Sequence, residues 1–431
     1  MKLTGKFSGG LYGTSNDSNR MEAYESSKTA SPSDTPTAQD DPQLKRHKIR
    51  SLVAYWILGL CNNYGYVVML TAANDIIGKS AESSESSKVR ENCKYLSTGA
   101  ILLADILPSL FIKLIAPFIP FIVNLRVGIC VLLAASGFIA VAFGETIFVS
   151  LLGVILTSFC SGLGEVTYLQ YSAFYKKNVV SAWSSGTGGA GVIGALSYSL
   201  LKTIGMKTTL LVMLLIPALT AISFWIILPK PSEQDIATAL EIQTKVNQEE
   251  LKNLKGSVLK KLKLVPGLMK YMIPFGLVYF FEYFINQGTF EIIQIPNATN
   301  TEESLATQYR WLQVTYQVGV FISRSSVNFC HIKQTWAMAV LQGINVVIFV
   351  TEAIYYYIPN IYIVVALVLW EGLLGGSSYV NTYYRITKEV EPENRQFSMA
   401  ITGFADSAGI SLAGVFAIFA HNAICKIPVS S

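Results

Sequence analysis

The chain has 431 residues, of which 51% are hydrophobic and only 14% are charged, and its formal net charge at pH 7 is +5. Soluble domains carry about 25% charged residues, so this composition excludes an ordinary soluble enzyme and indicates an integral membrane protein. A mean hydropathy of +0.42 points the same way.

The first 50 residues are rich in Ser, Thr, Asp and Pro and contain no apolar run, so we expect residues 1–50 to form a disordered cytosolic tail. Several basic residues between Lys45 and Arg50 directly precede the first apolar segment. Because positive residues stay on the cytosolic side of membranes, the N-terminus is predicted to be cytosolic.

Eleven apolar segments of spanning length follow, which makes the predicted fold an all-α polytopic membrane protein. Six form a first half, residues 51–228, and five form a second half, residues 268–421, followed by a short tail, residues 422–431. The predicted spans are 52–74, 97–118, 126–143, 147–168, 181–201, 208–228, 269–293, 309–323, 335–356, 361–384 and 398–420.

Three irregular features are expected between and within these spans. Residues 75–94 form a polar loop, and Pro108 and Pro117 interrupt the helix of the second span. The charged segment 229–267 forms a cytosolic linker between the halves. Apolar positions from Leu251 to Leu262 suit an amphipathic helix on the membrane surface, and a solvated linker is the equally open alternative.

The two halves resemble each other in the order of their features. Spans four and ten each carry one acidic residue, Glu165 and Glu371, beside glycines, and spans five and eleven are both rich in Gly, Ala and Ser. Two six-span repeats, the second without its last helix, predict a major-facilitator-like bundle in which two pseudo-symmetric halves enclose a substrate path.

Acidic and amide side chains inside the spans are the candidate substrate and proton pathway, since a buried charge in a membrane is costly and usually functional. The strongest candidates are Glu165 and Glu371, which could take up a proton on one side and release it on the other. The alternative is that each pairs with a Lys, Arg or Tyr to lock helices together. Further candidates for this pathway are Glu282, Asp406, Asn62, Asn286 and Gln287.

Four other intramembrane charges are candidates for gating or anchoring: Asp105, Lys113, Arg310 and Arg324. Asp105 and Lys113 lie on one helical face, so the two could also pair with each other. The glycines that open the fifth span are read as close-packing positions against neighbouring helices. These helix-packing glycines are Gly186, Gly188, Gly189 and Gly191.

Two features depend on the predicted topology. Asn297 lies in an Asn-Ala-Thr sequon on the side opposite the cytosol, so we expect it to be glycosylated. Cys93 and Cys425 fall on that same oxidising side, so they are predicted to form a disulfide. The six cysteines and three histidines show no metal-ligand spacing, and we expect no metal, no cofactor, no enzymatic activity and no nucleic-acid partner.

Several longer segments closely resemble the battenin family of lysosomal membrane proteins. They include SGLGEVT from Ser161, WSSGTGGAGVIGALSY from Trp183, EYFINQG from Glu282 and EGLLGGSSYVNT from Glu371. The resemblance implies a fold related to major-facilitator and equilibrative nucleoside transporters. It also implies a late endosomal and lysosomal location, and links to glycerophosphodiester clearance, lysosomal pH, basic amino-acid transport and autophagy.

The family's blocks contain Glu282, Arg324 and Asp406, which the resemblance therefore marks as functional positions. The expected function is proton-coupled export of small polar or anionic metabolites through the lipid bilayer, with glycerophosphodiesters favoured by the resemblance. The alternative is a non-transporting scaffold that regulates endolysosomal trafficking, pH or amino-acid transport. In that case the N-terminal tail and the central linker would recruit cytosolic trafficking proteins.

Overall fold

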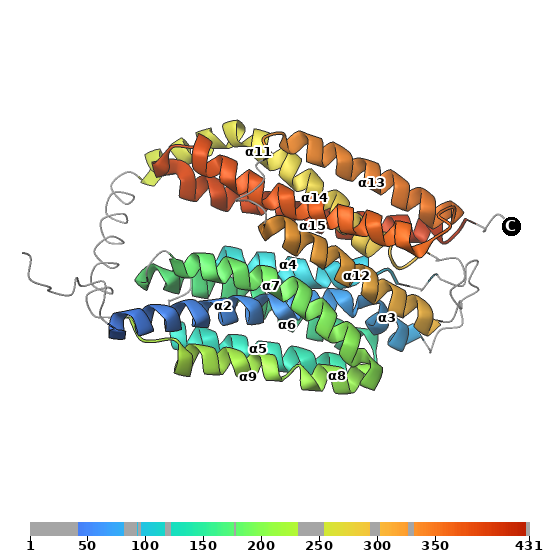
Figure 1. Cartoon of the computed structure of the whole chain (residues 1–431), viewed down its shortest axis with the longest axis horizontal. Coiled ribbons are helices and arrows are strands. Elements are labelled where there is room, and N and C mark those ends of the chain that lie inside the picture. Colours follow the sequence, from blue (N-terminus) through green and yellow to red (C-terminus); the bar gives the residue numbers. More distant parts are fainter. Residues whose placement is uncertain are drawn as a thin grey trace, which may run out of the picture. The chain divides into compact units, whose positions relative to one another are not determined.

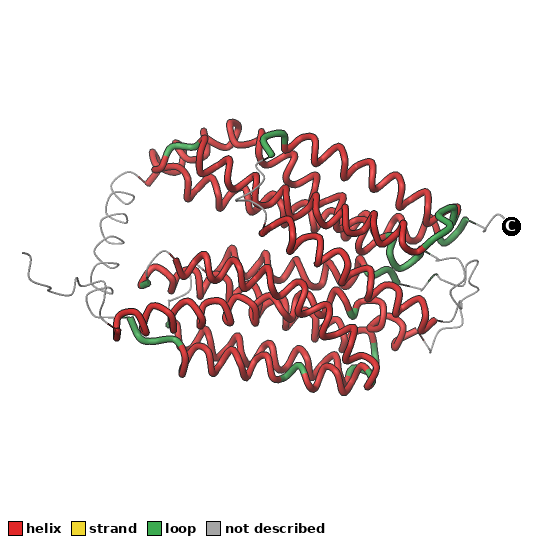
Figure 2. The backbone as a smooth tube through the Cα atoms, in the orientation of Figure 1, coloured by secondary structure: helices red, strands yellow, loops and turns green. Residues whose placement is uncertain are grey.

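The structure is a computed structural model of the whole chain. It describes residues 42–81, 93, 96–116, 122–175, 178–231, 254–293, 302–325 and 332–427. Helices joined by short loops account for these residues, and no strand occurs among them (Figure 2). The chain divides into two units, residues 1–49 and residues 50–431, and the second unit contains the helical bundle.

In the first unit the structure describes residues 42–49, which are helical and exposed from Lys45 onward. The predicted disordered tail lies outside the described residues as far as position 41, and the prediction is wrong for residues 42–50. Pro42 is the first residue of a helix there, a position where its missing N–H costs no hydrogen bond.

Each predicted span coincides with a helix or with consecutive short helices. In the first half these are α2 (Pro42–Thr71), α4 (Gly99–Ile115), α5 (Val123–Phe143), α6 (Ile147–Tyr171), α7 (Asn178–Leu201), α8 (Met206–Val212), α9 (Leu215–Ile222) and the π-helical turn η4 (Ser223–Ile227). In the second half they are α11 (Leu254–Gly288), α12 (Glu302–Ser325), α13 (Thr335–Tyr355), α14 (Ile361–Glu389) and α15 (Pro392–Ile424). Shorter helical pieces are α3 (Ala73–Ala81), η2 (Ser172–Phe174) and η3 (Lys202–Ile204).

Among the described residues, 8 helical segments are long and apolar enough to cross a membrane by themselves. The predicted spans in α4, α7 and α12 do not meet that test. Helix α4 has only 17 residues, and α12 carries many polar side chains along its length. Polar helices of this kind are tolerated in a membrane where they face protein or a polar interior rather than lipid.

Pro108 does not end the second predicted span, because a neighbouring helix repairs the backbone there. The proline lies inside α4, and the next amide, Ser109 N–H, donates to Ser158 Oγ of α6 at 2.9 Å. The Ser158 hydroxyl in turn donates to the carbonyl oxygen of Asp105. The Ser158 hydroxyl therefore bonds to both the Ser109 N–H and the Asp105 carbonyl oxygen, and it holds α4 against α6. Pro117 lies outside the described residues.

Two predicted loop boundaries are wrong. The polar loop expected from residue 75 begins later, because Asp75 lies in α3 and is only 8% exposed. The residues from Leu254 onward do not form a separate surface helix; they are the first turns of α11, which continues without a break to Gly288.

The two halves meet through a small set of helices. Helix α12 contacts α7, and α15 contacts α4, so each contact joins a second-half helix to a first-half helix. Figure 1 shows the first-half helices in blue to green and the second-half helices in yellow to red. Hydrogen bonds, an ion pair and a disulfide join the halves near Leu70, Asp75, Cys93, Glu291 and Cys425. We call this end of the bundle the disulfide end, and the opposite end, near Lys230 and Lys263, the linker end.

Buried hydrophobic clusters also join the two halves toward the disulfide end. One buried cluster contains Val67 and Ala195 of the first half together with Val314 of the second, and the largest cluster also draws residues from both halves. Near the linker end, the cluster around Tyr55 and Phe224 belongs to the first half alone, and the cluster around Tyr271 belongs to the second. The halves are therefore packed together at the disulfide end.

Glycines allow the close approach of α2 and α7. A Cβ at Gly186 would overlap the backbone oxygen of Trp56, and a Cβ at Gly59 would overlap the backbone oxygen of Trp183. Gly191 lies against the side chain of Gln317 in α12. At Gly188, by contrast, an added Cβ would meet nothing within 4 Å, so the prediction of a packing role is wrong for that residue.

Candidate functional site

The first half contributes one ion pair to the interior of the bundle. Lys113 Nζ of α4 lies 2.6 Å from Glu165 Oε2 of α6, and the two side chains are 30% and 36% exposed. Both side chains are therefore only partly buried. The suggested pairing of Lys113 with Asp105 is wrong, since Asp105 is fully buried and its carboxylate oxygens have no hydrogen-bond partner among the described residues.

The second half contributes a guanidinium held by tyrosines. Arg324 of α12 donates from Nη2 to Tyr279 Oη of α11 at 3.2 Å. Its guanidinium carbon lies 4.4 Å from the centroid of the Tyr379 ring of α14, a cation–π geometry. Its buried Nε has no partner in the described part of the chain. A donor held in place and left without an acceptor is suited to an anionic ligand.

Asp406 of α15 lies near the first of these groups, and the charges of Arg324, Asp406, Glu165 and Lys113 all act on Tyr379. Ser407 Oγ donates to its Oδ1 at 3.0 Å, and the charges that act on the carboxylate most strongly include Lys113 and Glu165 of the other half. Charges of both signs, supplied by both halves, therefore face one another across the interface. We call Lys113, Glu165, Arg324, Asp406 and Tyr379 the central charge cluster.

Glu282 of α11 lies beside this cluster and is 2% exposed. Tyr316 Oη of α12 donates to its Oε1, and the carboxylate packs against Gly375 of α14, where a Cβ would collide with it. The glycine thus makes the room that a buried carboxylate needs.

Glu165 and Glu371 occupy corresponding helices, α6 and α14, but their surroundings differ. Glu165 is partly exposed and paired with Lys113, whereas Glu371 is completely buried and its carboxylate oxygens have no partner among the described residues. The charge of Glu282 is the one that acts on Glu371. The helices correspond, but the two side chains do not form a symmetric pair.

The three predicted amide residues have different surroundings. Asn62 donates to the backbone oxygen of Ser161 at 3.1 Å, so it fastens α2 to α6. Asn286 is 1% exposed, and neither side-chain polar atom has a described partner. Gln287 lies at the disulfide end, where its Oε1 accepts from Tyr309 Oη at 2.9 Å.

Arg310 also lies at the disulfide end, in an ion pair that joins the halves. Its Nη1 is 2.7 Å from Oδ1 and 2.8 Å from Oδ2 of Asp75. Two first-half residues contact the same carboxylate: Tyr198 Oη donates to Oδ2 at 3.1 Å, and Lys202 Nζ lies 3.5 Å from Oδ1. Sequence reasoning missed Asp75 because it placed that residue in a loop. The signal was its position next to the apolar residues that continue the first helix.

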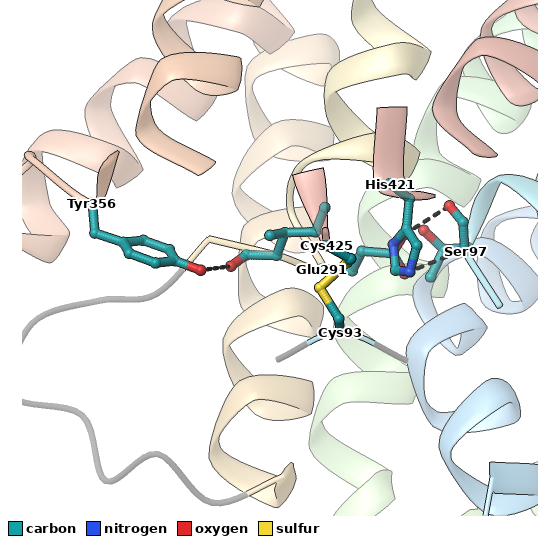
Figure 3. The surroundings of a disulfide bond; sticks show 8 residues. Cys93, Ser97, Glu291, Tyr356, His421 and Cys425 are labelled. Carbon is teal, nitrogen blue, oxygen red and sulfur yellow. Dashed lines mark hydrogen bonds and ion pairs between the residues drawn. A yellow bond between two sulfur atoms is a disulfide. The ribbon is translucent and has the colours of Figure 1, made fainter. Parts of the chain in front are cut away.

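A second network at the disulfide end surrounds the disulfide between Cys93 and Cys425, whose Cα atoms are 5.8 Å apart (Figure 3). Glu291 Oε1 accepts from Ser97 Oγ at 2.8 Å and lies 2.8 Å from His421 Nδ1. The predicted glycosylation site at Asn297 lies outside the described residues. Within the ranges that the structure describes, no group of three or more His, Cys, Asp or Glu side chains could hold a metal ion.

Comparison with known proteins agrees with this architecture. The profile of the family described as CLN3 protein matches residues 53–427. The chain is 43% identical to battenin of Canis lupus familiaris over 88% of this chain and 92% of that protein. It is 38% identical to Protein BTN1 of Yarrowia lipolytica over 88% of this chain and 95% of that protein.

Solved transporter structures share the fold at low sequence identity. A bacterial homologue of the human lysosomal transporter Spinster, in an inward-facing and occupied conformation, superposes with a TM-score of 0.57 at 13% identity, covering 86% of this chain and 81% of that one. A D-xylose–proton symporter superposes with a TM-score of 0.58 at 11% identity, covering 89% and 98%. The predicted major-facilitator-like helical bundle is thus confirmed. The chain belongs to the battenin family and is a multi-pass membrane protein with a transporter fold.

Proposed function

We propose that this protein is a proton-coupled transporter of the late endosomal and lysosomal membrane, which exports small polar metabolites. The favoured substrates are glycerophosphodiesters, and their export supports phospholipid catabolite clearance and lysosomal pH. The observation that carries the proposal is the central charge cluster, in which side chains of opposite sign from both halves face one another.

Two cations in this cluster suit a phosphodiester. Arg324 offers a planar guanidinium whose Nε has no hydrogen-bond partner among the described residues, and Lys113 offers an ammonium group on a side chain that is 30% exposed. Arg binds phosphate oxygens through a fixed fork of donors, while Lys acts as a mobile point charge. Lys113 must exchange Glu165 for the phosphate when substrate binds, so binding would release a carboxylate that can then take up a proton.

The remaining carboxylates supply the proton path. The charge of Lys113 acts on Asp406, and Glu282 and Glu371 are buried. A carboxylate in a membrane interior costs several kcal/mol unless it is paired or protonated. Substrate that occupies the cations therefore favours protonation of the acids, which is a route to coupling the two fluxes.

The arrangement of the halves supports a cycle of alternating access. They are held together at the disulfide end, so this state gives access from the linker end. The bias of Lys and Arg toward the linker end makes it the cytosolic end in this proposal. Rocking of one half against the other would then expose the central charge cluster to the opposite side.

Purified full-length protein in liposomes with an imposed pH gradient tests the proposal. We expect uptake of a radiolabelled glycerophosphodiester that depends on the gradient. We also expect uptake to fall at least tenfold in Arg324→Gln and to persist in Lys207→Gln, a matched loss of charge at an exposed first-half position. If the protein transports neither a glycerophosphodiester nor a polyol nor a basic amino acid, the result favours the scaffold alternative.

A further inference from the structure

The contacts between the halves at the disulfide end fall into two sets of different construction. The first set joins the start of α4 to the ends of α11 and α15 through Cys93, Thr98, Glu291 and Cys425. The second joins α2, α3 and α7 to α12: Asp75 pairs with Arg310, and Tyr309 Oη donates to the backbone oxygen of Leu70 at 2.9 Å. We call them the hinge side and the gate side.

The hinge side is covalent and is supported by a helix cap that comes from the other half. Glu291 Oε2 accepts from the backbone N–H of Thr98 at 3.0 Å, next to the first turn of α4. Thr98 Oγ1 donates to the backbone oxygen of Gln287 at 2.8 Å. Separating the halves here would leave the buried N–H of Thr98 without its acceptor, which is costly in a nonpolar setting.

Helix packing adds to the hinge side. Gly99 lies at the start of α4, and a Cβ there would meet the backbone oxygen of Gly414 at 2.8 Å and the Cβ of Ala417 at 3.0 Å. Two backbones that approach this closely leave no room for water or a side chain between them. Helices α4 and α15 are therefore in direct contact just inside the disulfide.

The disulfide alone would not keep these helices together. The stretch from Cys93 to Gly99 could extend to about 20 Å if it came loose. Ser97 and Thr98 prevent the start of α4 from moving away, because both bond to Glu291 and both are buried, with exposures of 1% and 0%. The disulfide and the Glu291 cap therefore act together.

The gate side is built so that it can come apart. Asp75 loses Arg310 if the halves separate there, but it keeps Tyr198 at 3.1 Å and Lys202 at 3.5 Å, both of its own half. Arg310 keeps the Thr307 hydroxyl, to which its Nη2 donates at 2.7 Å. Breaking this ion pair thus leaves Asp75 with a cation of its own half and Arg310 with a hydroxyl acceptor, which lowers the usual cost of separating a buried pair.

We propose that the transporter opens at the disulfide end by a one-sided rotation. The hinge side stays closed as a fixed pivot. The gate side opens by breaking the Asp75–Arg310 pair and the hydrogen bond from Tyr309 to Leu70, after which Tyr309 keeps Gln287 of its own half as acceptor. This inference rests on the proposed transport function, because it describes how one half moves against the other.

Distances between paired labels test the rotation in full-length protein in lipid nanodiscs. Spin labels on noncanonical amino acids keep the native disulfide intact. One pair, at Thr203 and Leu305, spans the gate side; the other, at Ala100 and Asn422, spans the hinge side. Double electron–electron resonance is recorded for both pairs at acidic and neutral pH, in the parent protein and in Arg310→Gln.

We expect Arg310→Gln to shift the gate pair toward longer distances while the hinge pair keeps its distribution. The matched control Lys207→Gln removes an exposed cation that lies 4.1 Å from the centroid of the Phe143 ring of its own half, and it should leave both pairs unchanged. A combined Cys93→Ser, Cys425→Ser and Glu291→Gln variant should broaden the hinge pair.

Equal lengthening of both pairs with the disulfide intact overturns the pivot and leaves the transport function standing. If neither pair lengthens in any variant while liposome flux persists, the rotation is wrong and transport uses another motion. If neither lengthens and flux is absent as well, the proposed function fails together with the pivot.

Discussion

Lys113 and Glu165 lie in different helices, 52 positions apart in the chain, and their charged atoms are 2.6 Å from each other. The pair faces the second half of the bundle, where Arg324 and Asp406 supply a further charge of each sign. An intramembrane ion pair that is 30–36% exposed is held together weakly enough to exchange partners with a charged ligand. That property distinguishes it from the fully buried carboxylate of Glu371.

The pairing predicts non-additive effects on folding. Lys113→Gln or Glu165→Gln leaves one charge in the bundle without its partner, so we expect each single variant to lower the yield of folded protein. The double variant removes both charges and should recover most of that yield. Fluorescence-detected size-exclusion chromatography of membrane extracts measures this cycle. Strictly additive losses would mean that the two residues do not depend on each other.

The glycines of α7 provide a second test with an internal control. Gly186→Ala places a Cβ on the backbone of Trp56, so we expect a loss of about 1–3 kcal/mol in the free energy of unfolding from overpacking. Gly188→Ala meets nothing within 4 Å, and it should stabilise the helix by up to about 1 kcal/mol. Thermal unfolding in detergent ranks the two variants. The same loss in both would contradict the close approach of α2 and α7.

The hydrogen bond from Tyr316 to Glu282 predicts a cost for losing one hydroxyl. Tyr316→Phe leaves a buried carboxylate without its donor, so we expect a destabilisation of about 1–3 kcal/mol and reduced flux. Tyr362→Phe removes a hydroxyl from a side chain that is 78% exposed and serves as the control. Apparent melting temperatures of the purified variants check the difference. Equal melting temperatures would argue that another group holds Glu282.

Glycosylation of Asn297 tests the predicted membrane topology. The sequon at Asn297 and the bias of basic residues predict that this residue is glycosylated on the side opposite the cytosol. Asn297→Gln should therefore increase the gel mobility of protein from native membranes by the loss of one glycan. An unchanged mobility in a correctly sorted variant would count against this orientation.

Periodic and compositional features could be predicted from the sequence, because each depends on neighbouring residues. The helices at the predicted spans and the carboxylate Glu165 follow from local hydropathy and local charge, and 8 helical segments among the described residues are apolar enough to cross a membrane by themselves. The predicted partnership of Cys93 with Cys425 followed from which side of the membrane each cysteine occupies, and the structure joins these two residues.

Contacts between distant helices could not be predicted in the same way. The partner of Lys113 depends on how α4 packs on α6, and a helical spacing within α4 suggested Asp105 instead. The role of Asp75 depends on α12, which begins more than 220 residues later, so its polarity alone suggested a loop. The repeat predicted a correspondence of α6 with α14. It could not reveal that Glu165 pairs with Lys113 while the Glu371 carboxylate has no hydrogen-bond partner among the described residues.

Proton coupling through the carboxylates is the central claim, and gradient-driven flux is its most direct measurement. Full-length wild type, Glu165→Gln and Glu371→Gln are reconstituted in liposomes, and uptake of a radiolabelled glycerophosphodiester is recorded across a range of imposed pH gradients. The account predicts that wild-type uptake rises with the gradient. Each Gln variant should lose that dependence while still exchanging substrate across the membrane. Gln variants that are folded and keep the full gradient-driven flux with the wild-type pH profile would contradict it.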